Sequence, residues 1–187
     1  MSLGNETLDY YARNADSFVS GTISADMAET RSRFTAHLPA SALILDFGCG
    51  SGRDTKAFLD AGFRVEATDG SEALCAKAAA YTGIPVRKAL FSDLDARDRY
   101  DGIWACASIL HLPKDELAQV LGKIEAALKT GGTLYTSFKC GSFEGLKDGR
   151  YFTCFTPQSL EEFWRRASSL RIFDRWITRD VRPGRDE

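Results

Sequence analysis

The sequence predicts an α/β fold, a three-layer α/β/α sandwich with a mostly parallel central sheet. Strand-like and helix-like patterns alternate through the middle of the chain, and that order favours parallel strands covered by helices. The first strand-like run, residues 42–47 (ALILDF), is almost wholly apolar, as expected for a strand buried on both faces. It ends at alternating glycines that lead into a helix-like segment. At 187 residues, the chain has the length of one domain.

Helices are predicted from apolar spacing and from residues that favour helix ends. The clearest helix opens at Pro113, a favoured first helical position, and apolar residues recur along it at core-facing spacing. Ser71 is placed to cap an alanine-rich helix. In chain order, the predicted helices are two within the opening 40 residues, one at 53–61, one from Ser71 through Tyr81, one from Pro113 through Leu128 that Gly131 and Gly132 stop, and one opened by Thr156 and Pro157.

Short runs of apolar and β-branched residues predict six strands, which alternate with these helices. The third run is short and contains two basic residues, so its strand signal is the weakest. The closing residues, 180–187, have the composition of a loop. The predicted strands are 42–47, 63–68, 85–90, 101–107, 132–139 and 170–178.

The glycine-rich turn after the first strand predicts a cofactor site. Gly48 and Gly50 admit positive φ angles and let the backbone approach a ligand closely. After the first strand of an α/β sheet, that geometry marks a nucleotide-type site at the carboxyl edge. Asp69 stands nineteen residues beyond Gly50, at the end of the second strand, where its carboxylate would accept hydrogen bonds from both ribose hydroxyls.

The residues after this turn favour a cofactor without a diphosphate. A dinucleotide fingerprint requires a third glycine where this chain has Arg53. Asp54 places a carboxylate in the first turn of the helix, where it would compete with a phosphate for the positive end of the helix dipole. S-adenosylmethionine (AdoMet) fits these features. Two alternatives stay open at this point: an NAD(P)-binding Rossmann oxidoreductase, and a protein that binds AdoMet without catalysis.

The pattern D-x-G-x-G-x-G from Asp46 to Gly52, followed by an acid at the end of the second strand, resembles that of class I AdoMet-dependent methyltransferases. The resemblance covers roughly residues 7 to 180, and the run GCGSGRDT is similar to a small bacterial branch that includes tellurite-resistance-type methyltransferases. It implies a Rossmann-like sheet. Members of the class normally finish with an antiparallel strand, but this chain ends in loop-like residues, so we expect that strand to be missing or truncated.

The resemblance also implies which residues contact the cofactor. The backbone of Gly48 and Gly50 would lie against AdoMet, Asp46 would anchor its amino-acid end directly or through water, and Asp69 would hold the ribose. Members of the class often have an acid that receives the adenine amino group. In the preferred register this position is Leu90, which is not an acid, and a shift of one turn gives the role to Asp93; both registers stay open. The full expected set is Asp46, Gly48, Cys49, Gly50, Arg53, Asp69, Gly70, Ser71, Phe91, Ser92, Asp93, Ala105 and Cys106.

Three residues are candidates for catalysis by direct in-line methyl transfer, which leaves S-adenosylhomocysteine (AdoHcy). His111 follows the fourth strand and is the first choice for a base, because imidazole titrates near neutral pH; its alternative is a local structural role. In the resembling class an N-terminal aromatic helix closes over the cofactor, which makes Tyr11 a second candidate. Arg150 would position an anionic substrate. His37 is expected at the surface.

The amino-acid composition excludes several classes of binding partner. The net charge of −2 supplies no field for a polyanion, so we expect a small-molecule acceptor rather than nucleic acid. No apolar run is long enough to span a bilayer or to form a signal sequence, which predicts a cytoplasmic protein without a membrane partner. Five cysteines without a C-x-x-C pair, and only two histidines, predict reduced thiols and no metal.

The expected organisation of the single domain is a helical cap at 1–40, a cofactor-binding core at 41–140 and a substrate-side segment at 141–187. The oligomeric state stays open.

Overall fold

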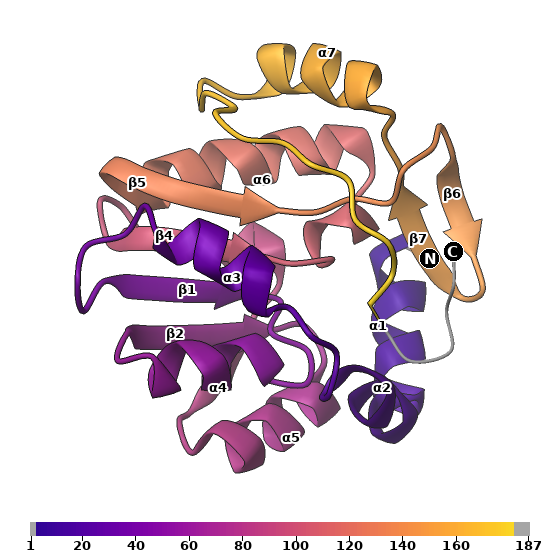
Figure 1. The fold of residues 1–187 in the computed structure, drawn as a ribbon. Coiled ribbons are helices and arrows are strands. Elements are labelled where there is room, and N and C mark those ends of the chain that lie inside the picture. The colour runs from indigo at the N-terminus through magenta and orange to yellow at the C-terminus, as the bar shows by residue number, and fades with distance from the viewer. Residues whose placement is uncertain (1–2, 182–187) are drawn as a thin grey trace.

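The centre of the molecule is a sheet of five parallel strands, seen edge to edge in Figure 1. A computed structural model describes residues 3–181. The strand order is β3-β2-β1-β4-β5, so the order reverses beside β1, which pairs with β2 on one side and with β4 on the other. The predicted fold class is confirmed. The strands are β1 (Leu43–Phe47), β2 (Arg64–Asp69), β3 (Val86–Lys88), β4 (Tyr100–Ala105) and β5 (Leu128–Thr136).

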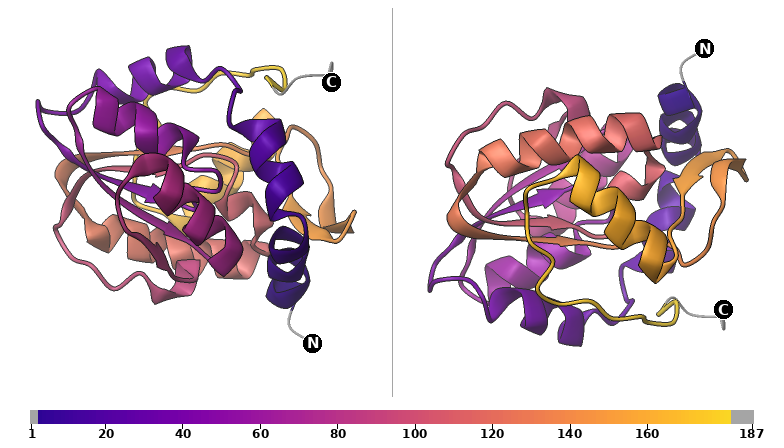
Figure 2. Two further views of the ribbon diagram at one scale, coloured as in Figure 1. Left: turned by 90° about the horizontal axis from the view of Figure 1, so that it is seen from below. Right: turned by 90° about the horizontal axis from the view of Figure 1, so that it is seen from above.

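Two helical layers cover the sheet because alternate side chains of each strand point to opposite faces. Leu45 of β1 packs in a core cluster with residues of α6 and α7, whereas Ile44 packs with residues of α3 and α4. The views in Figure 2 show these helices on opposite sides of the sheet. No helix among the described residues is long and apolar enough to cross a membrane. The helices after β1 are α4 (Arg53–Asp60), α5 (Glu72–Thr82), α6 (Lys114–Ala127) and α7 (Pro157–Ala167), and short 3₁₀ turns span Phe91–Asp93 and Ile109–His111.

The N-terminal region forms three helices, so the prediction of two is wrong. They are α1 (Leu3–Arg13), α2 (Ala15–Thr22) and α3 (Ala28–Thr35). The break between α1 and α2 falls at Asn14, whose side-chain amide donates to the carbonyl of Tyr10 at 2.8 Å. Figure 1 shows α1 and α2 beside the carboxyl ends of the strands, whereas α3 lies against the sheet.

The boundary between α6 and β5 lies earlier than predicted. Helix α6 ends at Ala127, and Leu128 already pairs with Tyr100 of β4. The predicted helix ran through Leu128 and the predicted strand began at residue 132. The glycines lie inside β5, where the pairing register shifts, and Gly131 has a φ of +80°. These glycines therefore bend a strand instead of ending a helix.

A β-hairpin that the sequence reading missed follows β5. Strands β6 (Glu144–Lys147) and β7 (Arg150–Thr153) pair antiparallel, and Asp148 and Gly149 between them both have positive φ. An Asp-Gly pair between two short extended runs is a strong hairpin signal, because both central residues of this turn need positive φ. The hairpin packs against α1 through a hydrogen bond from the amide of Tyr151 to Oγ1 of Thr7 at 2.9 Å.

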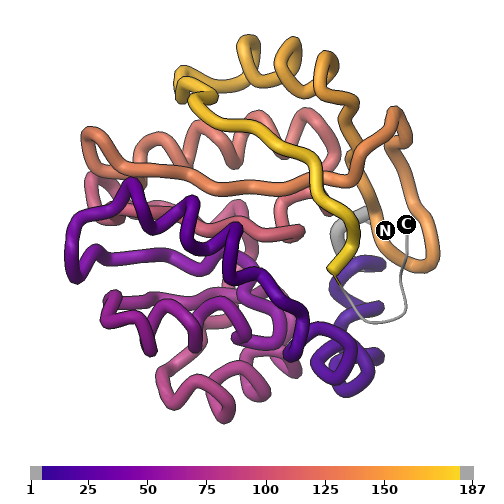
Figure 3. The backbone as a smooth tube through the Cα atoms, in the orientation of Figure 1, coloured from indigo at the N-terminus to yellow at the C-terminus, as the bar shows by residue number. Residues whose placement is uncertain are grey.

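The predicted strand at 170–178 is wrong. Residues 168–181 have no regular secondary structure, and this segment crosses the molecule as a single extended path, drawn in yellow in Figure 3. Its apolar side chains pack individually: Trp176 stacks on Tyr135 with 5.9 Å between ring centroids, and Phe173 contacts His37 at 4.7 Å. Within the described part of the chain, the main sheet ends at β5. The loop expected at 180–187 lies mostly outside the described residues.

Candidate active site

One cavity of about 1730 Å³ opens along the carboxyl ends of the strands and continues beneath the C-terminal segment. Typical ligand pockets occupy roughly 300 to 1,000 Å³, so this cavity has room for a cofactor together with a second molecule. It lies where the strand order reverses, which is the usual ligand position in such sheets. Most of the predicted site residues line it, whereas Ser71, Asp93 and Ala105 do not.

The loop after β1 has the conformation that its glycines predict. Gly48 and Gly50 have φ angles of +87° and +55°. The amides of Gly48 and Cys49 both donate to the carbonyl of Thr68 at 2.9 Å, which ties this loop to the end of β2. A Cβ atom at Gly48 would lie 2.5 Å from Cβ of Ser108, so only glycine fits there.

Asp69 is held by the backbone of two loops. Its Oδ2 accepts the amide of Gly50 and its Oδ1 accepts the amide of Ser71, both at 2.9 Å. Burial raises the pKa of Asp69, and these backbone hydrogen bonds oppose the rise. The carboxylate also lines the cavity, where an acceptor position that the backbone amides leave free can meet a ligand hydroxyl.

Asp46 is a buried carboxyl behind the same loop. Oγ1 of Thr55 donates to its Oδ2 at 2.5 Å. Burial, reinforced by the negative charge of Asp54, raises the pKa of Asp46 to about 7. A carboxyl of this kind changes charge near neutral pH and is sensitive to any cation placed beside it.

Asp54 lies in a network that the sequence reading did not foresee. Arg53 binds it through two nitrogens at 2.6 and 3.0 Å, Arg31 donates at 2.7 Å, and the indole of Trp104 donates at 3.0 Å. Burial alone would raise the pKa of Asp54, but the arginine hydrogen bonds outweigh burial and lower it. The Arg53 guanidinium also donates to the carbonyl of Thr22 at 3.3 Å, so it joins α4 to the end of α2.

Several other residues predicted to bind the cofactor cap or pack against local structure. Oδ2 of Asp93 accepts the amide of Leu90 at 2.8 Å and so caps a short turn, and Oγ of Ser71 caps α5 as predicted, accepting the amide of Leu74. Phe91 lies beside the glycine loop, with its Cζ 3.2 Å from where a Cβ of Gly48 would be. Burial raises the pKa of Cys106 to about 12, so this residue carries a neutral thiol.

The three candidate catalytic residues meet in the cavity. Tyr11 Oη lies 2.8 Å from His111 Nε2, and His111 Nδ1 lies 2.6 Å from the carbonyl oxygen of Tyr151. Since a carbonyl only accepts, Nδ1 carries the proton and Nε2 accepts from the tyrosine hydroxyl. Burial lowers the pKa of His111 to about 4, with Arg150 and Lys139 adding to this effect, so the ring is neutral at pH 7.

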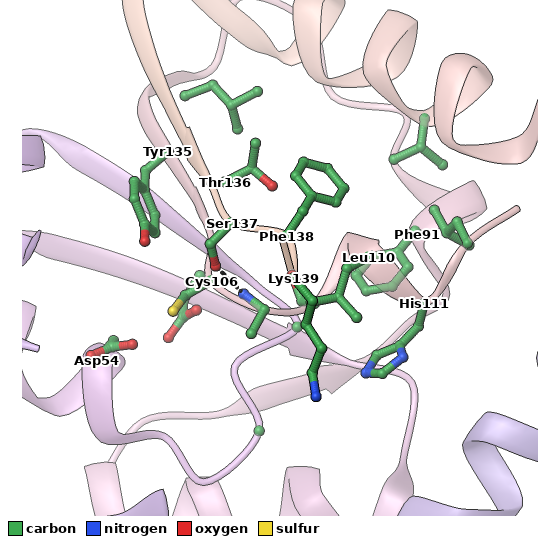
Figure 4. A pocket seen from close by; sticks show the side chains of 18 of the residues that line it. Asp54, Phe91, Cys106, Leu110, His111, Tyr135, Thr136, Ser137, Phe138 and Lys139 are labelled. Carbon is green, nitrogen blue, oxygen red and sulfur yellow. Dashed lines mark hydrogen bonds between the residues drawn. The ribbon is translucent and has the colours of Figure 1, made fainter. Parts of the chain in front are cut away.

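Arg150 completes this group. Its guanidinium carbon lies 4.4 Å from the ring centroid of Tyr10 and 5.1 Å from that of Phe152. Figure 4 shows His111 and Lys139 pointing into the same part of the cavity. Aromatic faces attract cations at these distances, so the charged wall of the cavity is built on aromatic rings.

Comparison with known proteins identifies the family. Residues 44–132 match the family described as "Methyltransferase domain". The chain is 27% identical to a Burkholderia thailandensis 1,6-didemethyltoxoflavin-N1-methyltransferase solved with 1,6-didemethyltoxoflavin and AdoHcy; the match covers 96% of this chain and 80% of that one, with a TM-score of 0.72. This chain is a class I AdoMet-dependent methyltransferase.

Two further structures share the fold of the methyltransferase. One is a complex from Haloferax volcanii between the Trm112 methyltransferase activator and a protein proposed to be a methyltransferase (24% identity, 86% of this chain, 75% of that chain, TM-score 0.69). The other is a TehB-like AdoMet-dependent methyltransferase from Corynebacterium glutamicum (22% identity, 86% of this chain, 82% of that chain, TM-score 0.65). A search of the curated proteins gave no match.

Sequence reasoning missed three residues that contact the candidate site. Phe18 of α2 lies 3.0 Å from where a Cβ of Gly50 would be, and Leu8 of α1 lies 2.6 Å from the corresponding position at Gly70. The two N-terminal helices therefore pack directly on the loops that follow β1 and β2. Lys139, after β5, lies 5.0 Å from the ring centroid of Phe152. The aromatic residues of the N-terminal region were a sequence signal for the contact of Phe18. No sequence signal indicated Lys139.

Proposed function

We propose that this chain transfers a methyl group from AdoMet to a small-molecule acceptor, with Tyr11 and His111 receiving the acceptor's proton. The observation that carries the proposal is the meeting of two sets of residues in one cavity: the loop after β1 with Asp69, and the hydrogen-bonded pair of Tyr11 and His111. The Burkholderia methyltransferase, which holds a small molecule and AdoHcy, supports the same class of acceptor.

The residues around the glycine loop fit AdoMet. The Asp69 carboxylate lines the cavity and suits a ribose hydroxyl, and the glycine backbone at residues 48 and 50 permits close approach of a ligand. Asp46 lies behind the loop, where it would meet the amino-acid end of the cofactor. When bound, AdoMet supplies an electrophilic methyl group on a sulfonium, and AdoHcy remains after the transfer.

The chain's own contribution to the reaction is alignment and proton removal. Holding two reactants in line contributes up to roughly 7 to 11 kcal/mol to lowering a barrier. An acceptor that arrives protonated would give its proton to Oη of Tyr11 while the tyrosine proton passes to Nε2 of His111, 2.8 Å away. The carbonyl of Tyr151 holds the other ring nitrogen and keeps the receiving lone pair aimed at Tyr11.

Calorimetry with AdoMet, AdoHcy and NAD tests this proposal. We expect AdoMet and AdoHcy to bind and NAD not to bind. Asp69→Asn should weaken AdoHcy binding by about 10-fold or more, because hydrogen bonds to a charged group contribute roughly 1.5 to 3 kcal/mol. A matched control is Asp60→Asn, which removes an exposed acid that does not line this cavity. Preferential binding of NAD, or no binding of any of the three, would overturn the proposal.

Three finer assignments belong to the same proposal. Placement in the tellurite-resistance-type branch, a cytoplasmic location and the division into cap, core and substrate side each rest on sequence reasoning. The branch has a direct test, because an enzyme of that type should form AdoHcy when supplied with a chalcogen oxyanion.

A further inference from the structure

Two positive side chains face the cavity without a negative partner among the described residues. Arg150 is half-buried between the rings of Tyr10 and Phe152, and the exposed Lys139 lies over the same Phe152 ring. Neither forms an ion pair with a carboxylate within residues 3–181. Both lie close enough to His111 to lower its pKa. The part of the cavity wall that Arg150 and Lys139 form is therefore cationic.

The Nε atom of Arg150 is buried and has no hydrogen-bond partner in the described part of the chain. A buried donor without a partner costs about 1 to 3 kcal/mol, and more when it is charged. The guanidinium presents its donors in a planar fork that matches the two oxygens of a carboxylate or of a phosphorus oxyanion. Because Nε itself is enclosed, the terminal nitrogens are the part of the guanidinium open to the cavity, and an oxyanion bound to them would balance the charges of Arg150 and Lys139.

The cations lie beside the pair that receives the proton. The rings of Tyr10 and Tyr11 are 5.5 Å apart, and the ring of His111 is 4.9 Å from that of Phe152. Tyr11 also contacts Phe18, the residue packed on Gly50, so the pair lies between the cationic wall and the cofactor loop. The guanidinium of Arg150 lies over the Tyr10 ring, which adjoins that of Tyr11, so the charge lies close to the pair.

We propose that the methyl acceptor is a small acid, whose oxyanion binds between Arg150 and Lys139 while a hydroxyl, thiol or amine on a nearby carbon meets Tyr11. The inference rests on the proposed function and adds to it the chemical class of the acceptor. The oxyanion fixes the position of the heteroatom that takes the methyl group. It also offsets the two positive charges that disfavour protonation of His111, and so makes the imidazole a better proton acceptor in the complex.

Calorimetry on the AdoHcy complex tests the inference with 2-hydroxybenzoate, its uncharged counterpart 2-hydroxybenzamide, and hydroxymethylphosphonate. We expect the two anions to bind and the amide to bind at least 10-fold more weakly. The ratio between the two anions distinguishes a carboxylate from a phosphorus oxyanion. Arg150→Gln and Lys139→Gln should each weaken anion binding by 10-fold or more and leave AdoHcy affinity unchanged. Arg97→Gln, which removes the same charge from the loop before β4, should bind like wild type.

A second measurement uses the unaltered protein. NMR titration of the His111 ring should show its pKa rise when 2-hydroxybenzoate is added, and stay unchanged with the amide. Equal binding of anion and amide, no binding of either anion, or full anion binding by Arg150→Gln would overturn the inference. In each of these cases, binding of AdoHcy by the wild-type protein would still support the proposed function. If the wild-type protein did not bind AdoHcy, the proposed function itself would be contradicted.

Discussion

The hydroxyl of Tyr11 lies 2.8 Å from Nε2 of His111, although the two residues are 100 positions apart in the chain. Helix α1 carries Tyr11 to the cavity, and the turn after β4 carries His111. The carbonyl of Tyr151 selects the tautomer of the imidazole, so the tyrosine is the donor in this pair. The helix at the start of the chain is thus part of the candidate catalytic site and more than a cover over it.

Tyr11→Phe should lower kcat by roughly 10²-fold or more, the usual contribution of general acid–base catalysis, because it removes the hydroxyl and keeps the ring. His111→Ala should have an effect of similar size. AdoHcy affinity should stay within about twofold of wild type in both variants. Steady-state kinetics and calorimetry measure these values. A parallel loss of AdoHcy affinity would show that the pair holds the cofactor instead.

His37→Ala is the control for this pair. It removes the other histidine of the chain, which contacts Phe173 of the C-terminal segment and has no place in the proposed proton path. We expect its kcat to match that of wild type. A loss of kcat as large as that of His111→Ala would mean that histidine substitutions act through general destabilisation.

Two buried groups should give opposite pH dependences of stability. The pKa of His111 falls from 6.5 to about 4 on folding, so the unfolded chain binds an extra proton between these values and stability is lost as pH falls through them. The pKa of Asp46 rises from 3.8 to about 7, so the folded chain holds the extra proton and stability is lost as pH rises through that range. In wild type the two effects oppose each other between about pH 4 and 6.5.

Asp46→Asn separates these effects. The difference in unfolding free energy between this variant and wild type should grow by about 3 to 4 kcal/mol from pH 4 to pH 7.5, because only wild type must then ionise a buried carboxyl. Urea unfolding at several pH values measures it. A difference that stays constant with pH would show that Asp46 is ionised at all these values. Stability gained at the expense of AdoMet affinity would mark this residue as part of the site.

Gly48→Ala and Gly62→Ala form a matched pair. The two glycines have nearly equal φ angles of +87° and +88°, so both substitutions impose the same backbone strain of roughly 1 to 2 kcal/mol. At Gly62 nothing lies within 4 Å of the added Cβ, whereas at Gly48 Ser108 lies 2.5 Å away. Gly48→Ala should therefore be the less stable variant and should lose AdoHcy binding. Equal unfolding free energies in the two variants would contradict the clash.

The parts of the fold that were predicted correctly depend on patterns inside one segment. Buried parallel strands need nearly continuous apolar runs, which is why 42–47 and 101–107 were recognised. The apolar residues at 170–178 gave the same signal for a different reason: Trp176 and Phe173 pack as single side chains, and a pattern of apolar residues does not say whether the backbone pairs with a strand. The hairpin was missed because β6 is short and mostly exposed, with a weak alternation.

The candidate site likewise contains residues that the sequence predicts and residues that it does not. Gly48, Gly50 and Asp69 were predictable because a loop and the end of the next strand meet wherever a parallel sheet forms. The partners of Asp54 were not, because Arg31 and Trp104 reach it from separate elements through tertiary packing. The nearness of Tyr11 to His111 likewise depends on how α1 docks, and only the resemblance pointed to it.

Asp54→Asn should destabilise the protein by roughly 3 to 5 kcal/mol, the usual cost of breaking a buried ion pair by removing one partner. The carboxylate is 6% exposed and binds two arginines, so the variant leaves both guanidinium groups without their anion. Asp60→Asn is the control. It removes the same charge from the same helix, where the pair with Lys56 is exposed and contributes about 0 to 1 kcal/mol. Urea unfolding at pH 7 compares them, and similar losses in the two variants would contradict a structural role for the Asp54 network.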